Sequence, residues 1–205
     1  MSNLRHRLAR VMTSAAVLIG LGIFPVAVSG PAHAASLSCS SRFDSTWSRG
    51  PYFYGAVAAS NARGQRTVMD IKGPSTANGA LAHIWHWYAG NSQYWCLKKH
   101  TFTDGSYAYQ MRNYYGGGCL DVAVNSPIAN GDKVWQWGCK SSSISSQLWA
   151  IEARGTVSTP DGSETSYVIR HDDTTQCVDV KGEGVTDGTT LQTWSCKYSG
   201  NQLFY

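Results

Sequence analysis

The feature of this chain that most restricts its fold is a pattern that occurs three times along the sequence. Each copy has an aspartate within a short apolar stretch, then a turn dipeptide, a tryptophan and a glutamine. The spacings from the aspartate to the tryptophan and to the glutamine are identical in the first and third copies and slightly longer in the second. Such regularity indicates one structural unit copied three times with small loop changes. The aspartates are Asp70, Asp121 and Asp179, the tryptophans are Trp85, Trp137 and Trp194, and the glutamines are Gln93, Gln147 and Gln202.

Each copy is predicted to form short strands joined by tight turns. The aspartate lies in an alternating stretch, an Asn-Gly or Asp-Gly pair predicts a hairpin turn, and a second alternating stretch follows. Residues 107–111 and 166–169 predict a further strand in the second and third units, which gives four strands per unit. Three such units around a pseudo-threefold axis would close into a barrel without exposed strand edges. We therefore expect an all-β single domain, with no separate catalytic domain.

Residues 1–34 have the pattern of an export signal. Three arginines precede an uncharged stretch over residues 11–32, and residues 32–34 fit a small-x-small cleavage site. A retained membrane anchor is the alternative, because the uncharged stretch is long enough to span a bilayer. Pro25 and the absence of a positive flank after the stretch favour cleavage. We expect a secreted, extracellular protein that begins at Ala35 and has no membrane span in its mature chain.

The charge balance argues against a nucleic-acid partner. The formal net charge of the whole chain is +4, but removal of the three arginines in the leader leaves 14 basic and 13 acidic residues. No cluster of lysine and arginine elsewhere supplies a local phosphate-binding surface. The eight tryptophans and eleven tyrosines instead provide many flat aromatic faces. A neutral partner fits this composition better than a nucleic acid does.

The repeated motifs resemble those of the ricin-type β-trefoil lectin family. The resemblance rests on the Cys-x-Asp-x start, the x-Trp-x-Cys middle and the Gln-x-Trp ending, which recur in register from about residue 52 to residue 205. It implies a β-trefoil fold with one shallow sugar pocket in each unit. The chain then divides into a signal peptide (1–34), an N-terminal extension (35–51) and a lectin domain (52–205). The implied partner is a carbohydrate with galactose-like, N-acetylated or xylose-type sugars, which is bound without being chemically changed.

The six cysteines all follow the leader, which suits an oxidising compartment. In the second and third units, two cysteines enclose one hairpin and are expected to form a disulfide. The first unit has Val68 and Trp87 at the equivalent positions, so an apolar pair replaces the bond there. The remaining two cysteines would join the N-terminal segment to the end of the first unit. The expected pairs are Cys39 with Cys96, Cys119 with Cys139, and Cys177 with Cys196.

The aromatic residues of the repeat divide into two groups. The aromatics that end the Gln-x-aromatic motifs are predicted to lie in the core, and the preceding glutamines to order the hairpins, with a secondary role at the sugar. The inner tryptophans come shortly after the turn, where the resemblance places the aromatic platform of a pocket. A sugar ring needs such a platform for its apolar face, and carboxylates and amides for its hydroxyls. The predicted core aromatics are Trp95, Trp149 and Phe204.

The third unit keeps the full set of residues that a sugar pocket requires. Asp179 is the predicted hydroxyl acceptor, Gln192 and Trp194 lie across the turn, and Asn201 and Gln202 close the rim. An ionised aspartate can accept charge-assisted hydrogen bonds from neighbouring hydroxyls, which would discriminate between epimers. The alternative is that the aspartate only caps a turn. We expect this unit to hold the best site.

The pocket of the second unit is altered. It keeps Asp121, Trp137 and Gln147, but has Trp135 where the third unit has Gln192, and Ser146 where it has Asn201. The loss of two rim amides should weaken recognition. The added aromatic indicates either a different saccharide or a filled, inactive site.

The pocket of the first unit is altered in another way. It keeps Asp70, Trp85 and Gln93, with His83 at the glutamine position and Ser92 at the asparagine position. A histidine can still donate a hydrogen bond. If it contacts the sugar, binding at this site should change near the ordinary imidazole pKa of about 6.5.

Other chemistries find little support. His83 and His86 are three positions apart, and residues at odd separations in a strand point to opposite faces, so neither a metal nor a cofactor is expected. No Gly-x-Ser-x-Gly motif frames a nucleophile, and the adjacent acids Asp172 and Asp173 lie in a predicted turn. The leading hypothesis is a non-catalytic lectin. A trefoil module that binds proteins is the first alternative, and an enzyme that acts on polysaccharide is a weaker one.

Overall fold

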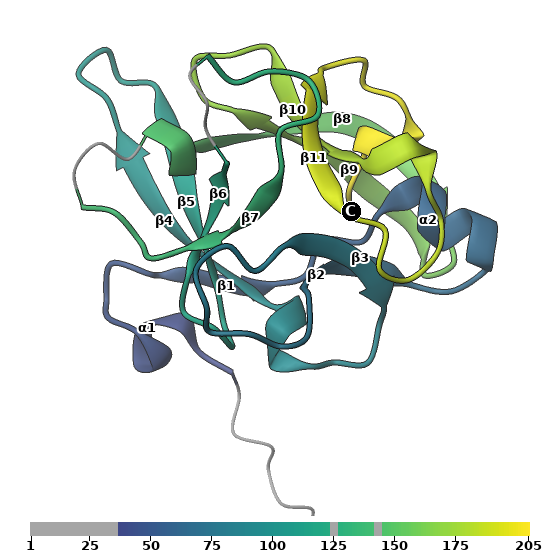
Figure 1. Ribbon diagram of the computed structural model, residues 1–205, viewed down its shortest axis with the longest axis horizontal. Coiled ribbons are helices and arrows are strands. Elements are labelled where there is room, and N and C mark those ends of the chain that lie inside the picture. Colours follow the sequence, from purple (N-terminus) through teal and green to yellow (C-terminus); the bar gives the residue numbers. More distant parts are fainter. Residues whose placement is uncertain (1–36, 124–126, 142–144) are drawn as a thin grey trace, which may run out of the picture. The chain divides into compact units, whose positions relative to one another are not determined.

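A barrel of antiparallel strands carries three hairpins at one end in the computed structural model (Figure 1), which describes residues 37–123, 127–141 and 145–205. Residues from Leu37 to Tyr205 form one compact unit. The predicted signal peptide lies outside the described residues. The strands are β1 (Arg49–Tyr52), β2 (Thr67–Ile71), β3 (Ala82–His86), β4 (Trp95–Thr101), β5 (Tyr107–Asn113), β6 (Cys119–Val122), β7 (Val134–Trp137), β8 (Trp149–Thr159), β9 (Gly162–His171), β10 (Gln176–Val180) and β11 (Leu191–Ser195).

The helical segments are short and lie between these strands. Those in α-conformation are α1 (Cys39–Arg42) and α2 (Val57–Arg63), and those in 3-10 conformation are η1 (Asn91–Gln93), η2 (Ser145–Gln147), η3 (Lys181–Glu183) and η4 (Gly200–Gln202). None of the helices in the described part of the chain has the length and apolar character needed to cross a bilayer.

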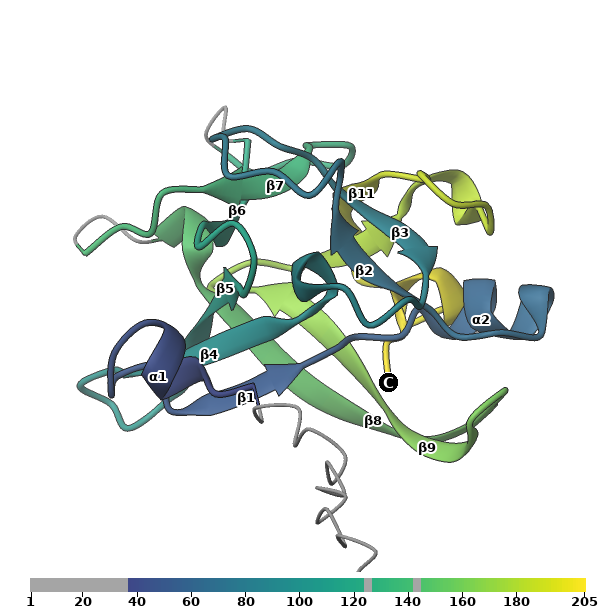
Figure 2. The same cartoon turned by 90° about the horizontal axis from the view of Figure 1, so that it is seen from below.

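The barrel wall consists of β1, β4, β5, β8 and β9, paired in that order. Phe204 completes the wall, because it bridges to Tyr167 on β9 and to Ala56. In the third unit these bridges take the place of the fourth strand that the repeat predicts. The all-β trefoil arrangement expected from the sequence is otherwise confirmed, and Figure 2 shows β1, β8 and β9 on the side away from the hairpin β6–β7.

The three hairpins are β2–β3, β6–β7 and β10–β11, and they share one register. Each aspartate lies opposite Gln192 or the residue that the alignment makes equivalent to it. Because directly opposed residues share one face of a hairpin, each pair is positioned at one pocket. The opposed pairs are Asp70 with His83, Asp121 with Trp135, and Asp179 with Gln192.

The turn dipeptides join the hairpins to one another. The side chain of the first turn residue accepts a hydrogen bond from a backbone N–H at the end of another hairpin, and the following glycine has a φ between 82° and 89°. A positive φ favours glycine, which explains why the sequence repeats it here. The bonds are Gly138 N to Asn78 Oδ1 (2.8 Å), Ser195 N to Asn130 Oδ1 (2.7 Å) and His86 N to Asp187 Oδ1 (2.8 Å).

The aromatics of the Gln-x-aromatic motifs form the centre of the core. Trp95, Trp149 and Phe204 are fully buried, as predicted. The indole Nε1 of Trp149 donates to the carbonyl of Leu120 at 3.0 Å, so its one polar group is satisfied. Burial of such large rings contributes several kcal/mol each, by the usual value of about 25 cal/mol per Å² of apolar area.

The three predicted disulfides are confirmed: Cys39–Cys96, Cys119–Cys139 and Cys177–Cys196. Trp47, for which the repeat offers no role, is buried beside Cys39, Cys96 and Cys119. Phe43 packs against Trp47, and the Arg112 guanidinium lies 3.9 Å from the Phe43 ring centroid. This cluster attaches the N-terminal segment to the barrel. Strand β1 straddles the domain boundary that the resemblance places at residue 52.

The first unit replaces its disulfide by burial. Val68 is fully buried, and the ring centroid of Trp87 lies 4.9 Å from that of Phe53 and 5.3 Å from that of Tyr94. The Arg66 guanidinium lies 5.3 Å from the Trp87 ring. Trp87 therefore also packs against residues from outside its own hairpin.

Candidate functional site

The hairpin β10–β11 and the segments η3 and η4 enclose a cavity of about 320 Å³. Four of the five residues predicted for the best site line it: Asp179, Gln192, Trp194 and Asn201. The repeat did not identify the other lining residues. They are Lys181, Gly182, Glu183, Lys197 and Ser199.

The Asp179 carboxylate is fixed by three amide donors. Gln192 Nε2 lies 3.0 Å from Oδ1, and Asn201 Nδ2 and Gln202 Nε2 lie 2.8 Å and 2.9 Å from Oδ2. A carboxylate has about four lone-pair sites, so one acceptor site remains for a ligand hydroxyl. The three donors also hold the carboxylate in one orientation, which avoids the entropic cost of ordering it on binding.

Gln202 stands behind the carboxylate and not on the open side of the pocket. Its side chain is fully buried and does not line the cavity. Besides Asp179, its amide donates to the carbonyl of Ser195, and its Oε1 accepts from the backbone of Lys197 and Tyr198. Since no amide atom is left for a ligand, the expected sugar contact by Gln202 needs correction: the residue orients Asp179 and orders the hairpin.

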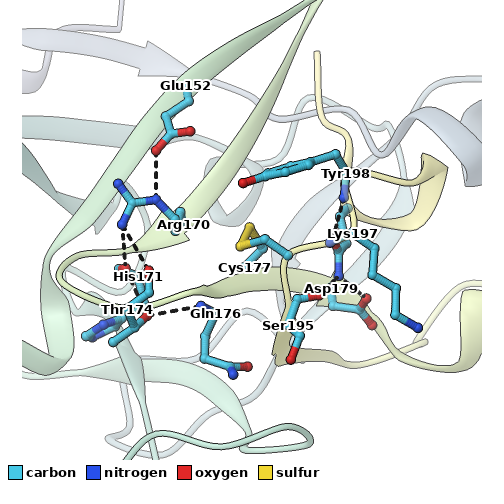
Figure 3. Close-up of a disulfide and its surroundings, with 12 residues drawn as sticks. Glu152, Arg170, His171, Thr174, Gln176, Cys177, Asp179, Ser195, Lys197 and Tyr198 are labelled. Carbon is cyan, nitrogen blue, oxygen red and sulfur yellow. Dashed lines mark hydrogen bonds and ion pairs between the residues drawn. A yellow bond between two sulfur atoms is a disulfide. The ribbon is translucent and has the colours of Figure 1, made fainter.

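Trp194 is partly exposed and lines the same cavity as Asp179. Trp194 lies opposite Cys177 in the hairpin, and Asp179 lies opposite Gln192. The two pairs are two residues apart along each strand, so all four side chains are on one face of the hairpin. Figure 3 shows Asp179, Lys197 and Tyr198 on the same side of the Cys177 disulfide. The cavity therefore combines an aromatic face with a fixed carboxylate.

The rim of this cavity carries charges of both signs. Lys181 and Glu183 come from η3, where Gly182 and Glu183 have φ values of 62° and 55°. Ser199 Oγ donates to Asn201 Oδ1 at 2.7 Å, which helps to orient that amide. Lys197 and Ser199 lie between Cys196 and Asn201 in the sequence, and this proximity to a predicted rim residue could have identified them as lining residues.

The pocket of the second unit is arranged differently. Lys140 Nζ lies 3.1 Å from Asp121 Oδ2 and donates to Ser146 Oγ at 2.6 Å. Gln147 Nε2 donates to the same carboxylate oxygen at 2.8 Å, and its side chain is fully buried. The ammonium is thus paired with the carboxylate that the sequence assigns to the sugar. Gln147, like Gln202, orders the hairpin.

Two tryptophans lie side by side in the second unit. The ring centroids of Trp135 and Trp137 lie 5.4 Å apart, and Trp137 is 39% exposed. The Nε1 of Trp135 is buried and has no hydrogen-bond partner among the described residues. Of the two alternatives for this unit, the geometry favours a filled pocket, with Trp137 as a surface aromatic.

The first unit brings Asp70 and His83 together beside Trp85, whose ring centroid lies 5.4 Å from that of His83. Asp70 Oδ1 and His83 Nδ1 are buried and have no hydrogen-bond partner within the described residues. Burial raises the pKa of Asp70. Gln93 is fully buried and donates to the carbonyl of His86, so it again serves the hairpin.

The expected pH dependence of the first pocket needs correction. Burial, with a smaller effect of Lys72, lowers the pKa of His83 to about 4. If His83 contacts the sugar, we therefore expect binding to change at a pH well below the ordinary imidazole pKa of about 6.5. His83 is expected to gain its proton near pH 4.

Within residues 37–123, 127–141 and 145–205, no three His, Cys, Asp or Glu side chains gather as metal ligands would. His86 instead has a structural role: its Nδ1 lies 2.7 Å from Asp187 Oδ2. Asp172 and Asp173 lie in the turn between β9 and β10.

Known proteins share this fold. Residues 44–137 match the protein-family model described as ricin-type beta-trefoil lectin domain-like. The match covers the first unit and part of the second, so the third-unit pocket lies outside it. No curated protein matches the chain.

Several solved structures superpose on most of the chain. ThreeFoil, a designed threefold symmetric protein, has a TM-score of 0.57 and 22% identity, and the match covers 74% of this chain and 94% of that one. The Rhizoctonia solani agglutinin has a TM-score of 0.55 and 18% identity, over 76% of this chain and 94% of that one. An exo-beta-1,3-galactanase from Clostridium thermocellum has a TM-score of 0.54 and 22% identity, over 75% of this chain and 30% of that one.

At these identities the superpositions establish the fold. The aspartates, turns and buried aromatics described above recur in all three units. The chain therefore has a β-trefoil fold, and residues 44–137 are similar to the ricin-type beta-trefoil lectin domain-like family.

Proposed function

We propose that this protein is a secreted, non-catalytic lectin whose principal sugar site is the pocket of the third unit. The observation that carries the proposal is the Asp179 carboxylate, which three amides hold in a cavity beside the partly exposed Trp194. A pyranose ring has an apolar C–H face and a rim of hydroxyls. Trp194 would stack on the face, and Asp179 and Asn201 would bind the rim.

The proposed ligand is a neutral sugar unit of a larger glycan. Two lysines and one glutamate line the cavity with Asp179, so charges of both signs surround it. Its volume of about 320 Å³ is at the lower end of the range of about 300–1,000 Å³ for small-molecule sites, and suits one ring better than a long segment. Galactose-like, N-acetylated and xylose-type sugars are the candidates.

The pocket of the second unit is not proposed as a sugar site, because Lys140 forms an ion pair with its carboxylate, Asp121. The first pocket is a weaker candidate, because Asp70 and His83 retain buried polar atoms without partners among the described residues. Occupation of both the first and third pockets by one glycan would raise the apparent affinity through avidity. A polymeric or cell-surface glycan is therefore the proposed partner.

The proposal includes export. Residues 1–34 would be removed as a signal peptide, and the three disulfides would form in an oxidising compartment. Mass spectrometry of the protein from culture fluid should find Ala35 at the N-terminus. A secreted form that retains residues 11–32 would contradict this part of the proposal.

A glycan array tests sugar binding directly. The mature protein is compared with Trp194→Ala and with the matched variant Trp137→Ala, which removes the equivalent residue from the second unit. We expect Trp194→Ala to lose the bound glycans and Trp137→Ala to retain them. If the two variants behave alike while both remain folded, the pocket assignment is wrong. A reducing-end assay on any bound polysaccharide distinguishes a lectin from an enzyme, because only an enzyme releases product continuously.

A further inference from the structure

A second and larger cavity lies among the strands of the barrel, separate from the three hairpin pockets. Its volume is about 550 Å³, and its lining comes from β1, β4, β5, β8 and β9, from the connecting residues Phe53, Tyr54, Arg66 and Asp161, and from Tyr205. That volume lies well inside the range of about 300–1,000 Å³ found for small-molecule sites. None of the residues predicted to bind sugar lines this cavity.

The threefold repeat places a tyrosine in this cavity from each unit. Tyr52 lies opposite Trp95, Tyr109 opposite Trp149, and Tyr167 opposite Phe204. The three partners are the equivalent aromatics of the Gln-x-aromatic motifs, so the three tyrosines occupy equivalent positions. All three line the cavity. We call Tyr52, Tyr109 and Tyr167 the tyrosine ring.

Two further tyrosines face the same space. Tyr107 is 50% exposed, and its ring centroid lies 5.6 Å from that of Tyr109. Tyr54 is buried, and its burial together with the neighbouring tyrosine ring raises the pKa of its phenol. Each of these five tyrosines lines the cavity, and no hydrogen bond joins any of their phenol hydroxyls to another described residue. Five hydroxyls are thus available as donors and acceptors.

Charged groups stand at the edge of this cavity. Arg66 Nε lies 2.7 Å from Asp161 Oδ2, and Tyr205 donates to the same oxygen at 3.0 Å, so these three groups satisfy one another. Arg49 lies 5.8 Å from the ring centroid of Tyr109 and makes no ion pair within the described residues, and neither does Glu164. A guanidinium and a carboxylate therefore remain open to a ligand.

We propose that the cavity of the tyrosine ring is a second saccharide site, which binds glycan independently of the hairpin pockets. The aromatic faces suit the C–H faces of sugar rings, and the phenols, Arg49 and Glu164 suit their hydroxyls. A purely apolar ligand fits less well, because it would remove five hydroxyls and two charged groups from water without replacing their hydrogen bonds. The larger volume suits two or three linked sugars.

The test uses tyrosine-labelled protein in which the principal pocket is disabled by Asp179→Ala. Lactose, chitotriose and xylotriose are titrated to about 50 mM, high enough to detect a millimolar site, while the ring signals are followed by NMR. At least one saccharide should shift the signals of the tyrosine ring. Addition of Tyr107→Ala and Glu164→Gln should weaken the binding of that saccharide by at least about ten-fold. The matched change Tyr115→Ala, at an exposed tyrosine outside the cavity, should have no effect.

Each other outcome overturns the proposal. Absence of shifts with all three saccharides excludes a saccharide site in this cavity. Shifts that survive Tyr107→Ala and Glu164→Gln place the saccharide elsewhere. Thermal unfolding of every variant confirms that the fold is retained. Because every protein in this test carries Asp179→Ala, a negative result does not bear on the sugar site proposed for the third unit. Conversely, this cavity can still be tested if the third unit proves not to bind sugar.

Discussion

The second and third units carry the same aspartate, tryptophan and lysine, but the lysine behaves differently in the two. In the second unit Lys140 lies 3.1 Å from Asp121 and contacts Ser146. In the third unit Lys197 lines the cavity without binding Asp179, because Asn201 donates to that carboxylate oxygen. One residue at the rim, serine or asparagine, thus decides whether the carboxylate is paired with a cation or held by amides.

The residue opposite the aspartate strengthens this difference. Gln192 supplies a second amide to Asp179, whereas Trp135 supplies only a ring to Asp121. A glutamine amide can donate a hydrogen bond to the carboxylate and still accept one from a sugar hydroxyl. The Trp135 indole offers no acceptor, and its ring lies against Trp137. We therefore expect that the aspartate and tryptophan shared by both units are insufficient for sugar binding.

Removal of the aspartate is expected to have the largest effect. Asp179→Ala should weaken glycan binding by about 100-fold or more, because a charged acceptor and the order of three amides are lost together. Asp121→Ala should leave binding at the third unit unchanged. Isothermal titration calorimetry measures both, with thermal unfolding as the control for folding. Equal losses in the two variants would show that the two pockets are not distinct.

Exchange of the rim residue should have a smaller effect. Asn201→Ser removes an amide from Asp179 and gives Lys197 the partner that Lys140 has in the second unit, so binding should fall by about ten-fold. The double variant Asn201→Ser with Lys197→Ala should recover part of that loss, because no ammonium then competes for the carboxylate. If the double variant is weaker than Asn201→Ser alone, the lysine does not close the pocket.

The sequence predicted the trefoil and the three hairpins that hold the aspartates, because strand alternation and turn positions are local properties. It did not predict the ion pair of Lys140, which depends on whether a flexible side chain finds a partner across a loop. It also could not predict the low pKa of His83, since burial by residues from other strands sets that value. Trp47 stayed unexplained for the same reason: its neighbours are distant in the sequence.

An insertion in the first unit prevented the recognition of the tyrosine ring from the sequence repeat. Tyr109 and Tyr167 precede the first cysteine of their hairpins at the same spacing, but Tyr52 lies farther ahead of Val68, which is the equivalent residue of the first unit. Helix α2 (Val57–Arg63) accounts for the difference, because it lies between Tyr52 and its hairpin. Only the pairing of the strands shows that the three tyrosines are equivalent. Repeats are thus easier to recognise around shared turns than around an insertion.

Conversion of the second unit should give a still smaller effect. Ser146→Asn offers Asp121 the amide that Asp179 has, and Lys140 should then turn toward solvent. Because Trp135 still replaces the glutamine, we expect only a few-fold gain above the detection limit, near millimolar affinity. NMR titration in the Asp179→Ala background isolates this unit. A gain equal to the affinity of the third unit would mean that Trp135 does not obstruct the pocket.

The turn of the third unit, where Asp187 replaces the asparagines of the other two, should show the smallest effect. Asp187 pairs with Arg63 and with His86, and all three side chains remain partly exposed. Asp187→Asn keeps an acceptor for the backbone of His86 but removes the ion pair with Arg63 and the carboxylate that His86 contacts, so the free energy of unfolding at pH 7 should fall by about 0.2–1 kcal/mol. Urea unfolding of the two proteins measures this difference.

The pH dependence of that difference has a definite sign. Burial would raise the pKa of Asp187, but the hydrogen bonds from Arg63 and His86 outweigh it and lower the pKa to about 2. A carboxyl group with a lowered folded pKa stabilises the protein above its unfolded pKa of about 3.9, and loses that contribution as pH falls toward about 2. The wild type should therefore exceed Asp187→Asn in stability from pH 7 to about 5 and match it near pH 2. Asn130→Asp, whose neighbour is Ser195, should show no such gain, and a difference that persists at pH 2 would assign the effect of Asp187 to packing and not to charge.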